Sequence, residues 1–320
     1  MPVINEWSPL KKVIVGVADG ARHPEIDLSV RIVNNCEIQD EQDIATGLFD
    51  QQIVDEANED LDKFVDFLES QDIEVLRPNK TQPGYYNFCP RDSVFVYDDI
   101  TIATPMPIKP RKDEWKAFGH HLSDVVNVDC SFSEELYNPE AIGPVDGVLA
   151  ITEHEPAFDA ANIIKANDHI LYLVSNTGNK KGGHLLQDIL GNRAKVHMVE
   201  DIYAFSHIDS TVTFLREGLM LLNPSRIKDK NQLPKPFQSW DVIWSPQPVV
   251  DPNAKGMCSP WVLTVNLASI NENLVCIEEN QIELRKELAK HKIESIGLPG
   301  RHSITLGGGF HCVTLDLDRA

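Results

Sequence analysis

The chain has 320 residues, enough for one large domain with a substantial core, and its net charge is −20. This acidity disfavours nucleic-acid phosphates and anionic membrane surfaces as partners, whereas a cationic small substrate is compatible with it. No apolar run reaches the length of a membrane span, and the N-terminal residues lack the basic and apolar regions of a signal peptide. We therefore expect a cytoplasmic protein with neither a nucleic acid nor a membrane as partner.

The six cysteines are spread along the chain and form no CxxC pair: Cys36, Cys89, Cys130, Cys258, Cys276 and Cys312. This spacing argues against a disulfide scaffold and a zinc ribbon, and it favours a reducing compartment. No linker, low-complexity segment or long charge run divides the sequence. We expect one domain over residues 1–320.

The predicted elements follow one another in a repeated order. A buried strand is predicted at 12–17, and helical periodicity at 53–70 is followed by a strand at 73–76. The same helix–strand succession recurs at 185–190 with 194–199, and at 278–290 with 293–298. Strand pairs are predicted at 93–97 with 100–103, and at 211–215 with 219–222. The unit is ββαβ, and repetition at roughly sixty residues predicts a closed α/β array.

A glycine-rich turn near the C-terminus precedes a cysteine, in the sequence GGGFHC at 307–312. Three glycines allow a sharp bend or a close approach of the backbone to a ligand. A lone cysteine is otherwise a small buried hydrophobe. Because Cys312 directly follows such a turn, we interpret it as a presented thiol and a candidate nucleophile.

A second cluster begins the hairpin at 211–222. If the segment is already a strand there, His207 and Asp209 point to the same face. They would then be a general base with an anionic neighbour, or two groups that hold one cationic substrate. The alternative is a histidine satisfied at a strand entry.

Two further carboxylates precede predicted strands. Asp159 lies among alanines just before an apolar strand at 163–164, where aspartate is disfavoured unless it forms a turn. Arg91 and Asp92 lie at the mouth of the strand at 93–97, where they are either functional or a local ion pair in a surface turn.

Five segments together resemble the amidinotransferases: CPRD at 89–92, FDAA at 158–161, HID at 207–209, NPSR at 223–226 and GGGFHC at 307–312. The resemblance is strongest to the arginine:glycine type and its relatives in bacterial natural-product synthesis, and the opening segment at 6–16 shares it. It implies a pentein fold, a five-bladed pseudosymmetric α/β propeller of ββαβ modules around a central substrate channel. Relatives are often homodimers.

The resemblance also implies roles. Cys312 falls on the nucleophile, His207 on the general acid/base and Asp159 on the acid that pairs with it. Asp92 and Asp209 fall on the two carboxylates that hold the guanidinium, and Arg226 falls on the arginine that binds the substrate α-carboxylate. Cys258 and Ser259 fall in a segment where the family has two serines near the substrate.

The implied reaction moves the amidino group of L-arginine to an acceptor amine, glycine or another primary amine, and releases ornithine. Carboxylates suit a planar guanidinium, a thiolate attacks its carbon, and the histidine protonates the departing amine. An S-amidino-cysteine gives ping-pong order without a metal or organic cofactor.

Two alternatives remain, an arginine deiminase-like hydrolase that lets water finish the reaction and a non-catalytic propeller that binds a cationic ligand. Several residues depart from the family pattern: Asn162 stands for an aspartate, Cys258 for a serine and Val313 for an aromatic residue, and Pro260 is unexpected. Because these positions lie near the expected pocket, they put glycine as the acceptor in doubt.

Overall fold

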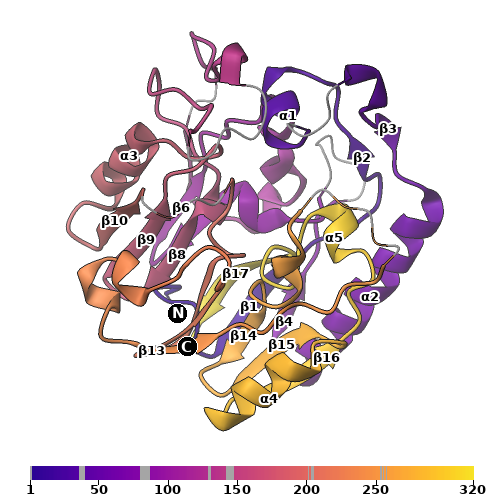
Figure 1. Cartoon of the computed structure of the whole chain (residues 1–320), viewed down its shortest axis with the longest axis vertical. Coiled ribbons are helices and arrows are strands. Elements are labelled where there is room, and N and C mark those ends of the chain that lie inside the picture. The colour runs from indigo at the N-terminus through magenta and orange to yellow at the C-terminus, as the bar shows by residue number, and fades with distance from the viewer. Residues whose placement is uncertain are drawn as a thin grey trace.

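The computed structural model describes residues 2–35, 40–79, 87–128, 131–141, 148–200, 202, 205–252, 254, 256 and 258–320. Cys36 and Cys130 lie outside the described residues. The described residues form five sheets of three strands and one of two, together with helices that lie outside the sheets (Figure 1). The α/β class expected from the sequence is confirmed.

All five three-stranded sheets share one plan, in which the second strand pairs antiparallel with the first and parallel with the third. Four sheets are consecutive in the chain: β5 (Val94–Tyr97), β6 (Ile100–Ala103) and β7 (Val125–Asn127); β8 (Ile163–Ala166), β9 (His169–Leu173) and β10 (Lys195–Val199); β11 (Val212–Arg216), β12 (Leu219–Leu222) and β13 (Asp241–Trp244); β14 (Ala268–Asn271), β15 (Leu274–Glu278) and β16 (Glu294–Leu298).

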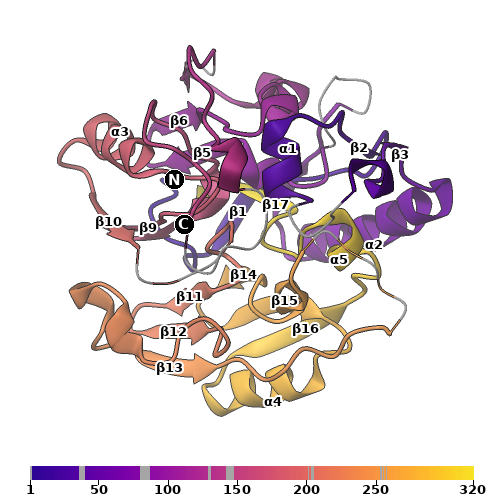
Figure 2. The same cartoon turned by 45° about the horizontal axis from the view of Figure 1, so that its top comes forward.

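The fifth sheet joins the two ends of the chain. Its first strand is the C-terminal β17 (Thr314–Arg319), which pairs with β1 (Leu10–Val15), and β1 pairs in turn with β4 (Glu74–Leu76). The N- and C-termini consequently lie close together in both views (Figures 1 and 2). Because β17 belongs to this sheet, the segment that holds Cys312 is anchored to the N-terminal strand.

Helices connect the second and third strands of three sheets. These are α2 (Gln51–Ser70), α3 (Lys180–Leu190) and α4 (Ile282–Lys290). In the other two sheets the described connections contain only short 3₁₀ helices, so the ββαβ pattern holds fully in three modules. The remaining short elements are α1 (Leu28–Val33), α5 (Ser303–Leu306), β2 (Arg22–His23) and β3 (Gly47–Leu48). No helix within the described ranges is long and apolar enough to cross a membrane.

Three helix starts differ from the sequence prediction. The helix expected from residue 53, α2, begins two residues earlier, at Gln51. The helix expected from residue 185 begins at Lys180, where the Asn179 side chain caps it by accepting a hydrogen bond from an N–H of its first turn. Gly183 weakens the helical signal in the sequence. The packing nevertheless requires a glycine here, because a Cβ at this position would lie 2.7 Å from the Met198 sulfur of β10. The helix expected from Glu278 begins at Ile282, because Glu278 ends β15.

First strands of different sheets contact one another. β17 contacts β5, and β8 contacts β11. Every residue of β5 and β8 is buried, as expected for strands covered on both faces. The loops that lead into these first strands therefore converge on one central region.

Replacing Leu171 tests the packing of one module. Leu171 is fully buried in the middle strand β9, so Leu171→Ala should lower the free energy of unfolding by about 2 to 5 kcal/mol. The matched change Leu48→Ala removes the same atoms from a side chain that is 71% exposed, and should cost about 0.5 kcal/mol or less. Denaturant unfolding measures both, and equal losses would contradict this packing.

Candidate active site

The candidate site residues occupy one recurring position in the fold, just before the first strand of a sheet. Asp92 precedes β5 by two residues, Asp159 precedes β8 by four and Asp209 precedes β11 by three. Cys312 precedes β17 by two. Since the first strands converge, residues as far apart in sequence as 92 and 312 meet in one buried cluster.

The Cys312 thiol is buried rather than presented, which corrects the expectation from its glycine-rich setting. Its Sγ lies 3.2 Å from Asp209 Oδ2, to which the S–H donates, and 3.0 Å from Nδ2 of Asn266. A hydrogen bond with the Cys89 thiol, burial and the charge of Asp209 hold the pKa of Cys312 well above that of an ordinary thiol. The Cys312 thiol is therefore neutral at neutral pH.

Glycines are required where the loop that contains Cys312 approaches its neighbours. Gly307 ends α5 with φ 83°, in the left-handed region. A Cβ on Gly308 would lie 2.6 Å from Cys89 Sγ and 2.7 Å from Cys312 Cβ. These contacts explain why the turn consists of glycine, and they agree with the close approach expected from the sequence.

His207 and Asp159 form a hydrogen-bonded pair, with Nε2 and Oδ2 separated by 2.7 Å. The second carboxylate oxygen of Asp159 accepts a hydrogen bond of 3.0 Å from the Asn162 amide. Burial lowers the pKa of His207, but Asp159, Asp92 and Asp209 raise it more, to about 9. The imidazole is therefore protonated at neutral pH.

The segment from His207 to Asp209 is a turn and not a strand, because β11 begins only at Val212. The sequence suggested that strand alternation puts His207 and Asp209 on the same face, but alternation does not apply to a turn. His207 has φ 31°, an uncommon conformation for a residue other than glycine. The turn directs His207 to Asp159 and Asp209 to Cys312.

Asp209 is held in its ionised form. Its Oδ2 accepts a hydrogen bond of 2.9 Å from Nδ1 of His311. Burial raises the pKa of Asp209, but the hydrogen bond and charge of His311 and the charge of His207 lower it more, to below its ordinary value. A buried carboxylate therefore lies directly beside the thiol.

Asp92 has one oxygen available for a ligand. Its Oδ2 pairs with Nη1 of Arg111 at 2.9 Å, whereas its buried Oδ1 has no hydrogen-bond partner among the described residues. Burial raises the pKa of Asp92, because Arg111 offsets only part of that effect. A buried acceptor without a donor is uncommon in folded proteins, and Oδ1 is suited to an N–H donor from a ligand.

Arg91 does not form the local ion pair with Asp92 that was one reading of the sequence. Its guanidinium is buried with Asp316 at 3.2 Å and Glu6 at 3.6 Å, and its Nε donates to the His311 carbonyl at 2.7 Å. Arg91 therefore holds the loop that contains Cys312, and the strand β17, in place.

The remaining predicted residues lie around this cluster. Arg226 donates from Nη1 to the hydroxyls of Ser210 (2.8 Å) and Thr211 (2.7 Å), next to the turn that contains Asp209. Burial and the charges of Cys89 and Asp209 raise the pKa of Cys258, whereas the charge of Arg226 lowers it. Cys258 is therefore close enough to interact electrostatically with all three residues.

Ser259 has a local role in the structure. Its hydroxyl accepts a hydrogen bond from the Trp261 N–H and caps the 3₁₀ helix Pro260–Leu263. The contacts of Ser259 therefore fix the direction of the loop that contains Cys258, and they do not reach the thiol cluster.

Sequence reasoning missed four buried residues that contact the predicted ones: Glu6, Arg111, Asn266 and His311. His311 and Glu6 lie inside two of the segments quoted above, GGGFHC at 307–312 and the opening segment at 6–16, but neither was assigned a role, and Arg111 and Asn266 belong to no quoted motif. Their contacts arise between distant segments, as between Asn266 and Cys312. The one available signal was the recurring position before a first strand, which Asn266 also occupies.

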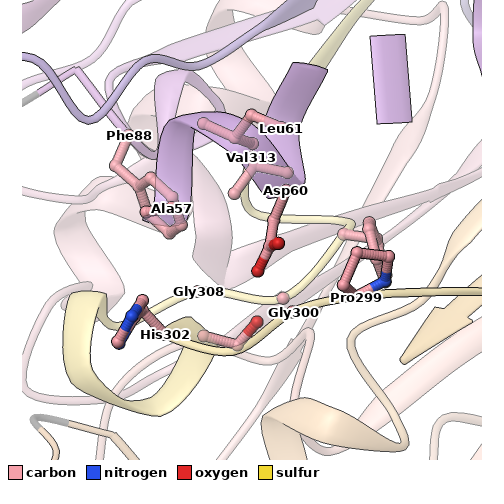
Figure 3. Close-up of a pocket in the computed structure, with 12 residues that line it drawn as sticks. Ala57, Asp60, Leu61, Phe88, Pro299, Gly300, His302, Gly308 and Val313 are labelled. Carbon is pink, nitrogen blue, oxygen red and sulfur yellow. The ribbon is translucent and has the colours of Figure 1, made fainter. Parts of the chain in front are cut away.

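Two cavities border the loop that contains Cys312. The first, of about 320 Å³, separates α2 from the loop before α5 and from the glycine-rich turn. Figure 3 shows Leu61 of α2 on one side of this space and His302 on the other. The second, of about 300 Å³, lies against Asp316. Neither is lined by Cys312 or Asp92, so both lie outside the thiol cluster. Among the described residues, no group of three or more His, Cys, Asp or Glu side chains could hold a metal ion.

Comparison with known proteins gives the family. No family model matches the chain. It is 35% identical over 341 residues to inosamine-phosphate amidinotransferase 1 of Streptomyces glaucescens, and this alignment covers 99% of this chain and 96% of that protein. It is 30% identical to the L-arginine:L-lysine amidinotransferase of Pseudomonas savastanoi pv. phaseolicola, over 98% of this chain and 93% of that protein.

Solved structures agree with these relatives. The inosamine-phosphate amidinotransferase of Streptomyces griseus matches with a TM-score of 0.93 at 34% identity, over 100% of this chain and 97% of that one. A dimethylarginine dimethylaminohydrolase of Pseudomonas aeruginosa matches with a TM-score of 0.63 over 97% of this chain and 100% of that one, but at 15% identity this likeness shows the fold alone. These identities of 30% to 35% extend over nearly the whole chain. They show that this chain belongs to the amidinotransferase family, whose members are enzymes that transfer amidino groups.

Proposed function

We propose that this enzyme transfers the amidino group of L-arginine to an acceptor amine through an S-amidino intermediate on Cys312. The observation that supports this most directly is that the carboxylates of Asp92 and Asp209 act electrostatically on both the Cys312 thiol and the His207 imidazolium. A cluster rich in buried carboxylates is suited to a cationic substrate. The named activity of the arginine:lysine relative agrees with arginine as the donor.

Asp92 and Asp209 would hold the guanidinium. Oδ1 of Asp92 has no donor among the described residues, and the carboxylate of Asp209 lies beside the Cys312 thiol. A planar guanidinium hydrogen-bonded to both would keep its carbon open to the sulfur. Its positive charge would also offset that of Asp209, which is one cause of the high pKa of Cys312. The thiol proton is released as the cation binds.

In the first half-reaction, the Cys312 thiolate attacks the guanidinium carbon and an S–C bond forms. The protonated His207 gives its proton to the departing nitrogen, the C–N bond breaks, and ornithine leaves with a neutral amine. Cys312 then carries a cationic amidino group, and His207 is neutral.

In the second half-reaction, a neutral acceptor amine attacks the amidino carbon. His207 removes a proton from that amine, the S–C bond breaks and the Cys312 thiolate is restored. Asp159, which Asn162 holds in place, would stabilise the charged form of His207 in both steps. The Asn162 amide, where the family pattern has an aspartate, can donate to Asp159, which an ionised aspartate could not do.

Arg226 would bind the α-carboxylate of arginine, and Cys258 and Ser259 would border the substrate. The acceptor is proposed only as a primary amine. The relatives differ in the acceptors that their names give, and Cys258 places a thiol of raised pKa where the family pattern has a serine.

For the fold, we propose that the five three-stranded sheets are the blades of one propeller domain spanning residues 1–320, with the site in its central channel. The shared strand plan and the pairing of β17 with β1 support this arrangement.

Incubation with arginine tests the covalent step. Arginine alone should leave one amidino group on the Cys312 peptide, seen by mass spectrometry, and sustained release of ornithine should require an added amine. Cys312→Ser should abolish the adduct and turnover. Cys276→Ser, which changes another buried thiol in β15, should retain both. Steady release of citrulline without an amine would indicate a hydrolase instead.

Titration of His207 tests its charge. The folded pKa of about 9 lies above the ordinary 6.5, so this charge stabilises the fold below about pH 6.5, and the stabilisation is lost as the pH rises through 9. Asp159→Asn removes a carboxylate that raises this pKa, and should lower the titration midpoint by at least about one unit. NMR of the imidazole protons measures the midpoint, and an unchanged value would contradict the pairing.

Arg226→Ala tests recognition of the carboxylate. Loss of a charge-assisted hydrogen bond should raise KM for arginine about 10- to 100-fold. KM for agmatine, which lacks the carboxylate, should change little. Arg193→Ala, a change at a half-exposed arginine that pairs with Asp99, serves as the control and should leave both values unaltered. Equal effects of Arg226→Ala on the two donors would refute this role.

A further inference from the structure

One position that leads into a first strand has no role in the mechanism above. Asp92, Asp159, Asp209 and Cys312 each precede a first strand, and Asn266 precedes the fifth, β14, by two residues. Asn266 is buried, and its side chain lies against the nucleophile rather than in the surrounding core.

The orientation of the Asn266 amide follows from its contacts. The backbone N–H of Cys312 can only donate, so the amide atom 3.0 Å from it is the acceptor Oδ1. The NH₂ group must then face the other way, where Nδ2 lies 3.0 Å from Cys312 Sγ and 3.4 Å from the Asp209 carbonyl oxygen. One side chain thus fixes the backbone of the nucleophile and donates to its sulfur.

Among the described residues, the other groups around the sulfur oppose the thiolate or are weaker donors. The carboxylates of Asp209 and Asp92 raise the pKa of Cys312, and Cys89, which is hydrogen-bonded to Cys312, offers only an S–H, a weak donor. Arg91 is close enough to interact with the thiolate charge, but its hydrogen bonds are with the His311 carbonyl, Thr314 and Asp316.

We propose that Asn266 is a catalytic residue whose N–H donates a hydrogen bond to the Cys312 sulfur and stabilises the thiolate during amidino transfer. The proposal rests on the role of Cys312 as nucleophile. A preorganised neutral donor suits this position, because it stabilises the developing negative charge without competing with the substrate cation for Asp209. The same hydrogen bond stabilises the thiolate when it is restored in the second half-reaction.

Asn266→Asp separates the two contacts of the side chain. An aspartate keeps an oxygen for the Cys312 N–H and replaces the donor to sulfur with a second oxygen. In full-length protein without arginine, the rate of Cys312 alkylation by iodoacetamide is followed against pH by peptide mass spectrometry. We expect the apparent pKa of Cys312 to rise by at least about one unit, and kcat to fall by about 10²- to 10³-fold, as for loss of a preorganised donor.

Two further variants control the experiment. Asn266→Leu removes both contacts and should also raise the Cys312 pKa. Asn179→Asp changes another buried asparagine, whose Oδ1 accepts from backbone N–H groups and whose Nδ2 donates to carbonyls. It should leave the Cys312 pKa and kcat of the folded enzyme unchanged.

An Asn266→Asp enzyme with the wild-type Cys312 pKa and kcat would overturn the proposal and reduce Asn266 to a backbone contact. This result is distinct from failure of the proposed function, because alkylation requires neither arginine nor turnover. Turnover that survives Cys312→Ser would instead refute the nucleophile, whatever the alkylation profile.

Discussion

The site depends on the contact between the neutral thiol of Cys312 and the ionised carboxylate of Asp209, which lie together in a buried cluster. A thiolate there is opposed by Asp209 and by burial, so an isolated thiol is a poor nucleophile. In the proposed mechanism, a bound guanidinium would remove this opposition and place its own carbon beside the sulfur. In this account the substrate activates the residue that attacks it, and the thiol stays protonated until a cation arrives.

The fold holds these opposed charges at fixed positions. Each group lies just before a first strand, and the first strands are anchored in separate sheets. Behind the nucleophile, buried ion pairs join Arg91 to Glu6 and Asp316, and Arg319 to Asp316. Displacing β17 would separate these charges and leave them buried without compensation. The ion pairs therefore fix the position of β17, in addition to its pairing with β1.

Much of this arrangement could be predicted from the sequence. Periodicity predicts the helices and the strands that follow them. The resemblance to the family motifs predicts that Cys312, His207 and Asp159 belong to one catalytic set. The local setting of single residues was less predictable. Burial of the Cys312 thiol and the turn at His207 arise from tertiary contacts, which override glycine content and strand alternation. Asn266 and Arg111 were missed because their partners lie far away in the sequence.

The central claim is that a guanidinium binds between Asp92 and Asp209 with its carbon facing residue 312. A crystal structure of the Cys312→Ser enzyme with bound L-arginine tests it most directly. The account predicts hydrogen bonds from the guanidinium to Oδ1 of Asp92 and to the carboxylate of Asp209, with the hydroxyl of the introduced serine facing the plane of the group. Arginine bound with its guanidinium away from these carboxylates, or turned from residue 312, would contradict it.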